Sequence, residues 1–101
     1  MEMLPRNKSG KFACPCCGCF TLDEGEIGSF EICPVCFWEV DNVQFADPEY
    51  AGGANTMSLV EARMKFAEIG AIDEEFRSSV RPPHDYELPP FDWSGQATTG
   101  R

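Results

Sequence analysis

Two five-residue stretches decide the fold of this chain: Cys-Pro-Cys-Cys-Gly at residues 14–18 and Cys-Pro-Val-Cys-Phe at residues 33–37. Each contains Cys-Pro-x-Cys, a spacing that lets two sulfurs face one ion, and each is called a knuckle below. Fifteen residues separate the two Cys-Pro-x-Cys units, as in proteins that hold zinc with four thiolates. We therefore expect a closed, structural Zn²⁺ site, with iron as the alternative because iron also accepts four thiolates. The predicted ligands are Cys14, Cys17, Cys33 and Cys36.

Two further cysteines, Cys16 and Cys19, leave the first knuckle with a second possible register, because they also form a Cys-x-x-Cys pair. We prefer Cys14 and Cys17, since that pair reproduces the proline position of the second knuckle. The roles of Cys16 and Cys19 stay open. Each could be a small buried hydrophobic residue, a reactive thiol beside the metal, or half of a Cys16–Cys19 disulfide switch.

The segment between the knuckles predicts a β-hairpin. Residues 20–22 and 29–32 alternate in polarity, and residues 23–28 between them form a polar turn with two glycines. Residues 37–40 would add a third strand. Residues 12–42 are therefore expected to form a zinc-ribbon-like module within a small α+β fold.

The rest of the chain predicts one helix and an irregular end. Residues 43–56 contain many helix-breaking residues and are expected to be a loop, whereas residues 59–69 have helical periodicity after a Ser58–Glu61 capping box. A short helical piece is expected at 73–78. The predicted domain organisation is a flexible N-terminus (1–11), one zinc-stapled domain (12–93) and a loose tail (94–101). Within that domain we expect the ribbon at 12–42, the loop and helix at 43–80, and a Pro-rich strap at 81–93 that carries aromatic residues.

Composition limits the function. The chain has 101 residues, a net charge of −9 and 43% hydrophobic residues. A charge of this sign disfavours binding to nucleic acid, and no apolar run is long enough to cross a membrane. All six cysteines lie between residues 14 and 36, and the first 20 residues lack the apolar region of a signal peptide. These features favour reduced, metal-binding thiols in the cytoplasm.

The ordered set of motifs resembles the cysteine-rich CPCC family of small bacterial proteins. The resemblance rests on the first knuckle, on Glu-Ile-Cys-Pro-Val-Cys-Phe-Trp-Glu at residues 31–39, and on Asp-Pro at 47–48. It continues through Gly-Gly-Ala-Asn at 52–55 and Ser-Leu-x-Glu-Ala-Arg at 58–63, and so covers about residues 12–71. It implies a metal-binding domain without an assigned activity. An aromatic residue commonly follows the first knuckle in that family, where this chain has Cys19.

These observations favour a non-catalytic protein that binds zinc and interacts with another protein. The acidic charge makes a protein with a basic surface one candidate partner. We expect no enzyme activity, because the single histidine, His84, lies far from the cysteines in sequence. Three alternatives stay open: an immunity or inhibitor protein for a basic toxin, a redox protein with rubredoxin-like iron or a Cys16–Cys19 switch, and a nucleic-acid-binding zinc ribbon. The oligomeric state is left open.

Overall fold

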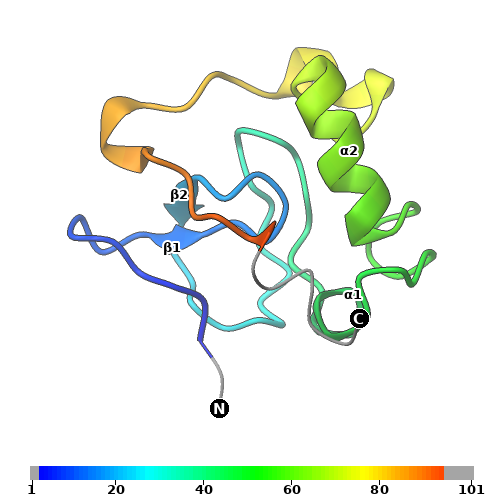
Figure 1. Ribbon diagram of the computed structural model, residues 1–101, viewed down its shortest axis with the longest axis horizontal. Coiled ribbons are helices and arrows are strands. Elements are labelled where there is room, and N and C mark those ends of the chain that lie inside the picture. The colour runs from blue at the N-terminus through cyan, green and yellow to red at the C-terminus, as the bar shows by residue number, and fades with distance from the viewer. Residues whose placement is uncertain (1–2, 95–101) are drawn as a thin grey trace.

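Each knuckle forms the tip of its own small hairpin in the computed structural model, which describes residues 3–94 (Figure 1). Around the first knuckle, β1 (Phe12–Ala13) pairs antiparallel with β2 (Phe20–Leu22). The amide of Cys14 continues this pairing by donating to the Cys19 carbonyl at 2.9 Å. Around the second knuckle, Ile32 and Glu39 form an isolated antiparallel bridge.

The predicted hairpin between residues 20–22 and 29–32 is therefore wrong. Residues 37–40 form no named strand, but they pair with residues 30–33 through the Ile32–Glu39 bridge and through main-chain hydrogen bonds, including one from the Val40 amide to the Glu31 carbonyl at 3.0 Å. A Cys-x-x-Cys turn reverses the chain within a few residues, so it brings together the two segments that flank it. The segments on either side of residues 23–28 are joined differently. The Glu31 carboxylate accepts hydrogen bonds from the amides of Asp23 and Glu24, each at 2.9 Å.

The predicted helix over residues 59–69 is confirmed as α2 (Leu59–Ile69). Its capping box is present: the Ser58 hydroxyl accepts from the Glu61 amide at 3.1 Å, and the Glu61 carboxylate accepts from the Ser58 amide at 3.0 Å. Gly70 ends the helix with φ 83°, a left-handed conformation that favours glycine. The buried residues of α2, Leu59 and Ala62, face the core beside the knuckles.

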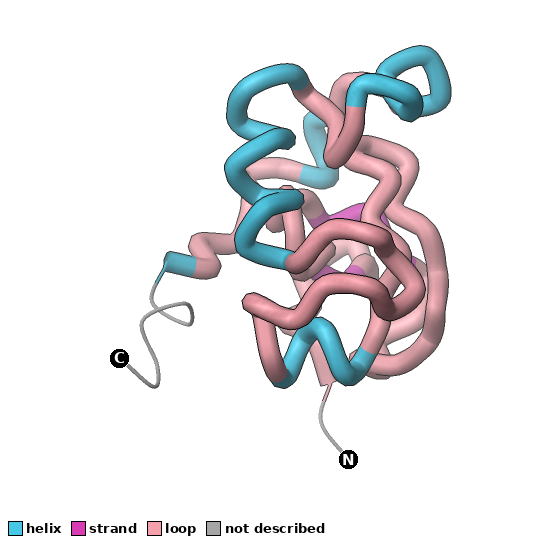
Figure 2. Tube along the Cα trace, turned by 90° about the vertical axis from the view of Figure 1, so that its right-hand side faces the viewer, coloured by secondary structure: helices cyan, strands magenta, loops and turns pink. Residues whose placement is uncertain are grey.

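Three shorter helical segments complete the described chain: α1 (Asn42–Ala46), η1 (Glu74–Ser79) and η2 (Asp85–Glu87) (Figure 2). The η1 segment matches the predicted helical piece at 73–78. The loop predicted over residues 43–56 is wrong at its start, where α1 lies. Asp41 starts α1 by accepting from the amides of Val43 and Gln44 at 2.7 and 3.1 Å. A helix of five residues is too short to show periodicity in the sequence.

The loop between α1 and α2 is held by two buried amide side chains, Gln44 and Asn55. The Gln44 amide nitrogen donates to the carbonyls of Tyr50, Asn55 and Met57 at 3.0, 3.2 and 2.9 Å. Asn55 accepts from the Glu39 amide at 2.9 Å and donates to the Glu39 carbonyl at 2.8 Å. Asn55 therefore pairs with the outer edge of the second hairpin as a neighbouring strand would.

Segments near both ends of the described chain pack on the first hairpin. The sequence predicted a flexible segment over residues 1–11, but in its described part Leu4 is only 3% exposed and its amide donates to the Gly25 carbonyl at 2.8 Å. The Ala13 amide donates to the Pro5 carbonyl, also at 2.8 Å. Burial of the apolar Leu4 side chain stabilises these contacts, which attach the described part of the segment to the core. Near the other end, Trp93 is buried against the first knuckle. Of the predicted tail at 94–101, residues 95–101 lie outside the described residues.

Candidate metal centre

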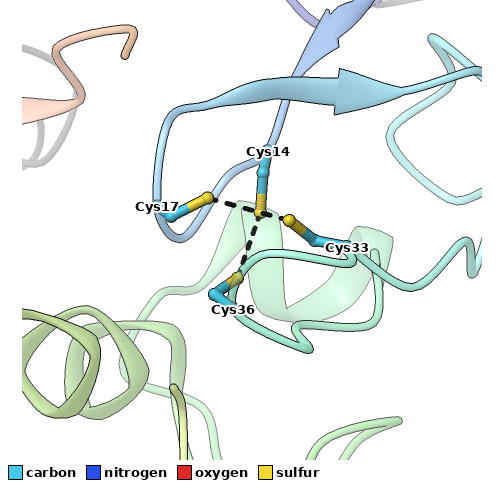
Figure 3. A group of neighbouring side chains, drawn as sticks. All are labelled: Cys14, Cys17, Cys33 and Cys36. Atoms are coloured by element: carbon cyan, nitrogen blue, oxygen red, sulfur yellow. Dashed lines mark hydrogen bonds between the residues drawn. The ribbon is translucent and has the colours of Figure 1, made fainter. Parts of the chain in front are cut away.

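Four cysteine sulfurs converge where the two knuckles face each other (Figure 3). All four Sγ atoms lie within 4.8 Å of one another, with 3.5 Å between Cys14 and Cys36 and 3.7 Å between Cys17 and Cys33. A tetrahedral zinc site with Zn–S bonds of about 2.3 Å has sulfurs about 3.8 Å apart, so the observed spacing fits such an ion. Cys14, Cys33 and Cys36 are fully buried, and Cys17 is partly buried. The four sulfurs are those that the spacing of the sequence favours.

The two knuckles share one backbone conformation. The Gly18 amide donates to the Cys14 carbonyl at 2.9 Å, and the Phe37 amide donates to the Cys33 carbonyl at 2.8 Å. Gly18 and Phe37 both have positive φ, 83° and 79°. This conformation is unusual for phenylalanine. The Phe37 ring stacks on Phe76 of η1, with centroids 4.2 Å apart, and this contact helps to offset the strain.

Backbone amides surround the sulfurs with hydrogen-bond donors. The amides of Cys16, Val35 and Trp38 point at the sulfurs of Cys14, Cys33 and Cys36 respectively, each at 3.4 Å. The Thr21 hydroxyl lies 3.1 Å from the Cys33 sulfur. Donors of this kind stabilise thiolates, which are the form of cysteine that binds metal.

The pKa values of the four thiols show why the cluster suits a cation. Burial raises the pKa of Cys14 to about 11 and raises the pKa of Cys36 well above its usual value. The hydrogen bond with Cys14 is the largest cause of the raised pKa of Cys17. The pKa of Cys33 is lowered because the other three thiols, Cys14 first, donate hydrogen bonds to its sulfur. Burial of the cluster therefore opposes ionisation of its thiols, and a bound cation would favour their thiolate forms.

The remaining candidate residues lie outside this group. Cys16 and Cys19 are 7% and 3% exposed, and neither belongs to the four-sulfur cluster. The pKa of Cys19 is lowered, chiefly by a hydrogen bond with Cys17. His84 is exposed and stacks on Tyr86, with centroids 5.4 Å apart. The register that pairs Cys16 with Cys19 is therefore not the one that forms the cluster.

The first knuckle is covered by residues distant in sequence. The Phe91 amide donates to the Gly18 carbonyl at 2.8 Å, and the Trp93 indole N–H donates to the Cys14 carbonyl at 2.7 Å. Nε of Arg63, on α2, donates to the Pro15 carbonyl at 3.0 Å. Sequence reasoning did not find these contacts, because no spacing rule connects residues so far apart.

The second knuckle has equivalent supports from the main chain. The Ile72 amide donates to the Cys36 carbonyl at 3.0 Å, and the Arg81 amide donates to the Pro34 carbonyl at 3.1 Å. The Arg81 guanidinium holds the Glu87 carboxylate with two hydrogen bonds, at 3.0 and 2.8 Å. Glu87 is only 2% exposed, so this ion pair anchors the segment that leads from the second knuckle toward the first.

The fold and the site define a small cysteine-rich protein with four cysteines positioned to bind a metal ion. The family described as Cysteine-rich CPCC matches residues 12–87, and the chain belongs to that family. The match confirms the resemblance seen in the sequence and extends it beyond residue 71, through η1 and the Arg81–Glu87 pair. A comparison with curated proteins found no match. Within residues 3–94, no helix has the length and apolar character needed to span a membrane.

Proposed function

We propose that this chain is a zinc-binding protein in which Zn²⁺ bridges the two knuckles and makes residues 12–42 a zinc-ribbon-like module. The observation that carries the proposal is the group of four sulfurs within 4.8 Å of one another, three of which also accept a backbone amide. Bound Zn²⁺ would supply a cross-link between the hairpins. In a domain of this size, the free energy of such a cross-link adds directly to the free energy of folding.

We further propose that the protein acts without catalysis, by binding another protein in the cytoplasm. Four cysteine ligands complete a tetrahedral zinc shell, whereas catalytic zinc keeps a position for water or substrate. The charge of −9 becomes about −11 when four thiolates and one Zn²⁺ are counted. Such a charge speeds association with a basic protein partner and opposes association with nucleic acid.

Iron is the second candidate metal, with electron transfer as its function. The amide hydrogen bonds to three sulfurs suit iron as well as zinc, because such bonds tune the potential of iron held by thiolates. The partly exposed Cys17 would provide a route for electrons near the surface.

Metal analysis of protein purified without added metal tests both candidates, with free thiols counted on the same native sample. The proposal expects one zinc per chain and two titratable thiols that do not hold the metal, those of Cys16 and Cys19. Iron with visible thiolate-to-iron absorption would make electron transfer the function. Protein without metal, containing disulfides, would overturn both.

A further inference from the structure

The peptide group that joins Pro15 to Cys16 makes two hydrogen bonds at its opposite ends. Its carbonyl oxygen accepts from Nε of Arg63 at 3.0 Å, and its N–H points at the Cys14 sulfur at 3.4 Å. A charged donor on the carbonyl of an amide polarises the whole peptide group, which makes its N–H a stronger donor. Arg63 is therefore linked to the sulfur of a predicted ligand through a single peptide.

The surroundings of Arg63 leave its charge available to the knuckle. Among the described residues 3–94, no carboxylate lies within ion-pair distance of its guanidinium. The guanidinium carbon lies 5.7 Å from the centre of the Trp93 ring, and that ring donates to the Cys14 carbonyl. Burial lowers the pKa of Arg63, but a guanidinium stays protonated in proteins.

The second knuckle provides an internal comparison. The Pro34 carbonyl accepts from the main-chain amide of Arg81 at 3.1 Å, and the Val35 amide points at the Cys33 sulfur at 3.4 Å. The donor on this carbonyl is a neutral amide, and the Arg81 guanidinium is paired with Glu87. The two knuckles therefore have the same turn and the same N–H to sulfur distance, but within the described part of the chain only the first has a cation bonded to its proline carbonyl.

We propose that Arg63 is a positioning residue of the metal centre, which stabilises the Cys14 thiolate by polarising the Pro15–Cys16 peptide and by offsetting the negative charge of four thiolates around one divalent ion. This inference rests on the proposed metal binding. It adds that a residue on α2, outside the ribbon-like module, sets the affinity of the site. Loss of outer partners of metal ligands typically weakens metal binding by about 10- to 100-fold.

Arg63→Gln and Arg63→Lys test the inference, with Arg77→Gln as the control for charge. Arg77 is exposed and, among residues 3–94, forms an ion pair with Glu74 alone, at 3.4 Å. Its substitution therefore makes the same change in net charge away from the cysteines. The affinity for Zn²⁺ is measured by competition with a chromogenic chelator, and the sulfur-to-metal charge-transfer band is measured with Co²⁺. A residue that only packs α2 against the knuckle would not change the energy of that band.

We expect Arg63→Gln to bind Zn²⁺ at least about tenfold more weakly than wild type and to move the Co²⁺ band to lower energy, because its sulfurs are less stabilised. Arg63→Lys should retain most of the affinity, and Arg77→Gln should match wild type. Equal affinity and band energy for Arg63→Gln and wild type would overturn the inference, as would an equal loss in Arg77→Gln. Failure of wild type to bind any metal would instead overturn the proposed function, and this inference with it.

A measurement on wild type decides the question even if Arg63→Gln does not fold. The amides of Cys16 and Val35 occupy the same position in the two knuckles, and each points at its sulfur at 3.4 Å. Their amide protons can therefore be compared in the zinc-loaded protein. The stronger donor should resonate further downfield in the NMR spectrum. We expect that proton to belong to Cys16, and a Cys16 resonance at or upfield of Val35 would overturn the inference.

Discussion

Gly18 and Phe37 occupy the same position in the two knuckles, and both have a left-handed backbone, with φ 83° and 79°. Different neighbours explain why one is glycine and the other phenylalanine. A Cβ atom on Gly18 would lie 2.4 Å from the Phe91 carbonyl oxygen, so the C-terminal segment can approach only a glycine. The Phe37 ring, by contrast, stacks on the ring of Phe76, a residue of η1. The tertiary neighbours of the knuckles therefore decide the residue at this position.

Substituting Gly18 by alanine should destabilise the protein more than the positive φ alone requires. Alanine at positive φ costs about 1 kcal/mol, and the clash with the Phe91 carbonyl should add about 2 kcal/mol. Gly52→Ala is the matched control, because Gly52 has φ 94° and open space around its Cβ position. Urea denaturation of the zinc-loaded proteins measures both. Equal losses in the two variants would mean that the segment around Phe91 does not pack on the knuckle.

Trp93 should contribute to stability through both its ring and its indole N–H. Trp93→Phe keeps an aromatic ring but loses the hydrogen bond to the Cys14 carbonyl, so we expect a loss of about 1–2 kcal/mol in the free energy of unfolding. Trp93→Ala should lose about 3–5 kcal/mol, because the side chain is 7% exposed. Tyr86→Ala, at a side chain that is 52% exposed, should change stability by less than about 0.5 kcal/mol. Wild-type stability in Trp93→Ala would contradict the packing described here.

Removal of one of the four proposed metal ligands should unfold the region around the knuckles. Cys14→Ser and Cys33→Ser should lose bound zinc and give insoluble or loosely packed protein, and a strong chelator should have the same effect on wild type. Cys19→Ser should keep its zinc, because the Cys19 sulfur lies outside the cluster. Metal content and near-UV circular dichroism distinguish the variants. Equal damage from all three substitutions would show that the ligand set differs from the four clustered cysteines.

The ion pair of Arg81 with Glu87 should stabilise the fold at neutral pH and lose its effect in acid. The hydrogen bond from Arg81 is the largest cause of the lowered pKa of Glu87, against the opposing effect of burial. A lowered folded-state pKa means that the stabilisation is complete above the ordinary value of 4.5 and is lost as the pH falls through the folded-state value. At pH 7, Glu87→Gln should lose about 2 kcal/mol, by the usual contribution of a charged hydrogen bond.

Urea denaturation of Glu87→Gln and wild type at several pH values checks this prediction. The difference in stability should be constant from pH 7 to about pH 5 and should shrink below about pH 4.5. Glu74→Gln is the control, because its ion pair with Arg77 is exposed and should contribute little at any pH. A difference that already shrinks between pH 7 and pH 5 would mean that another group, such as a cysteine thiol, controls the effect.

The sequence predicted those elements that depend on short-range chemistry. The four clustered cysteines follow from the Cys-x-x-Cys spacing, and α2 follows from its periodicity, its capping box and Gly70. The strand pairing was not predictable in the same way. Alternation in residues 20–22 and 29–32 identifies extended segments, but it does not identify their partners. The knuckle turns pair Phe12–Ala13 with Phe20–Leu22 instead.

The candidate ligands and the helix that follows them could be found from the sequence, because both depend on residues a few positions apart. The segments that cover the knuckles could be found only from the folded chain. Arg63 reaches Pro15 across 48 positions, and Trp93 reaches Cys14 across 79. Contacts of this range depend on how the whole chain closes around the core, where burial of apolar surface selects the arrangement and hydrogen bonds then fix it. No local pattern in the sequence contains that information.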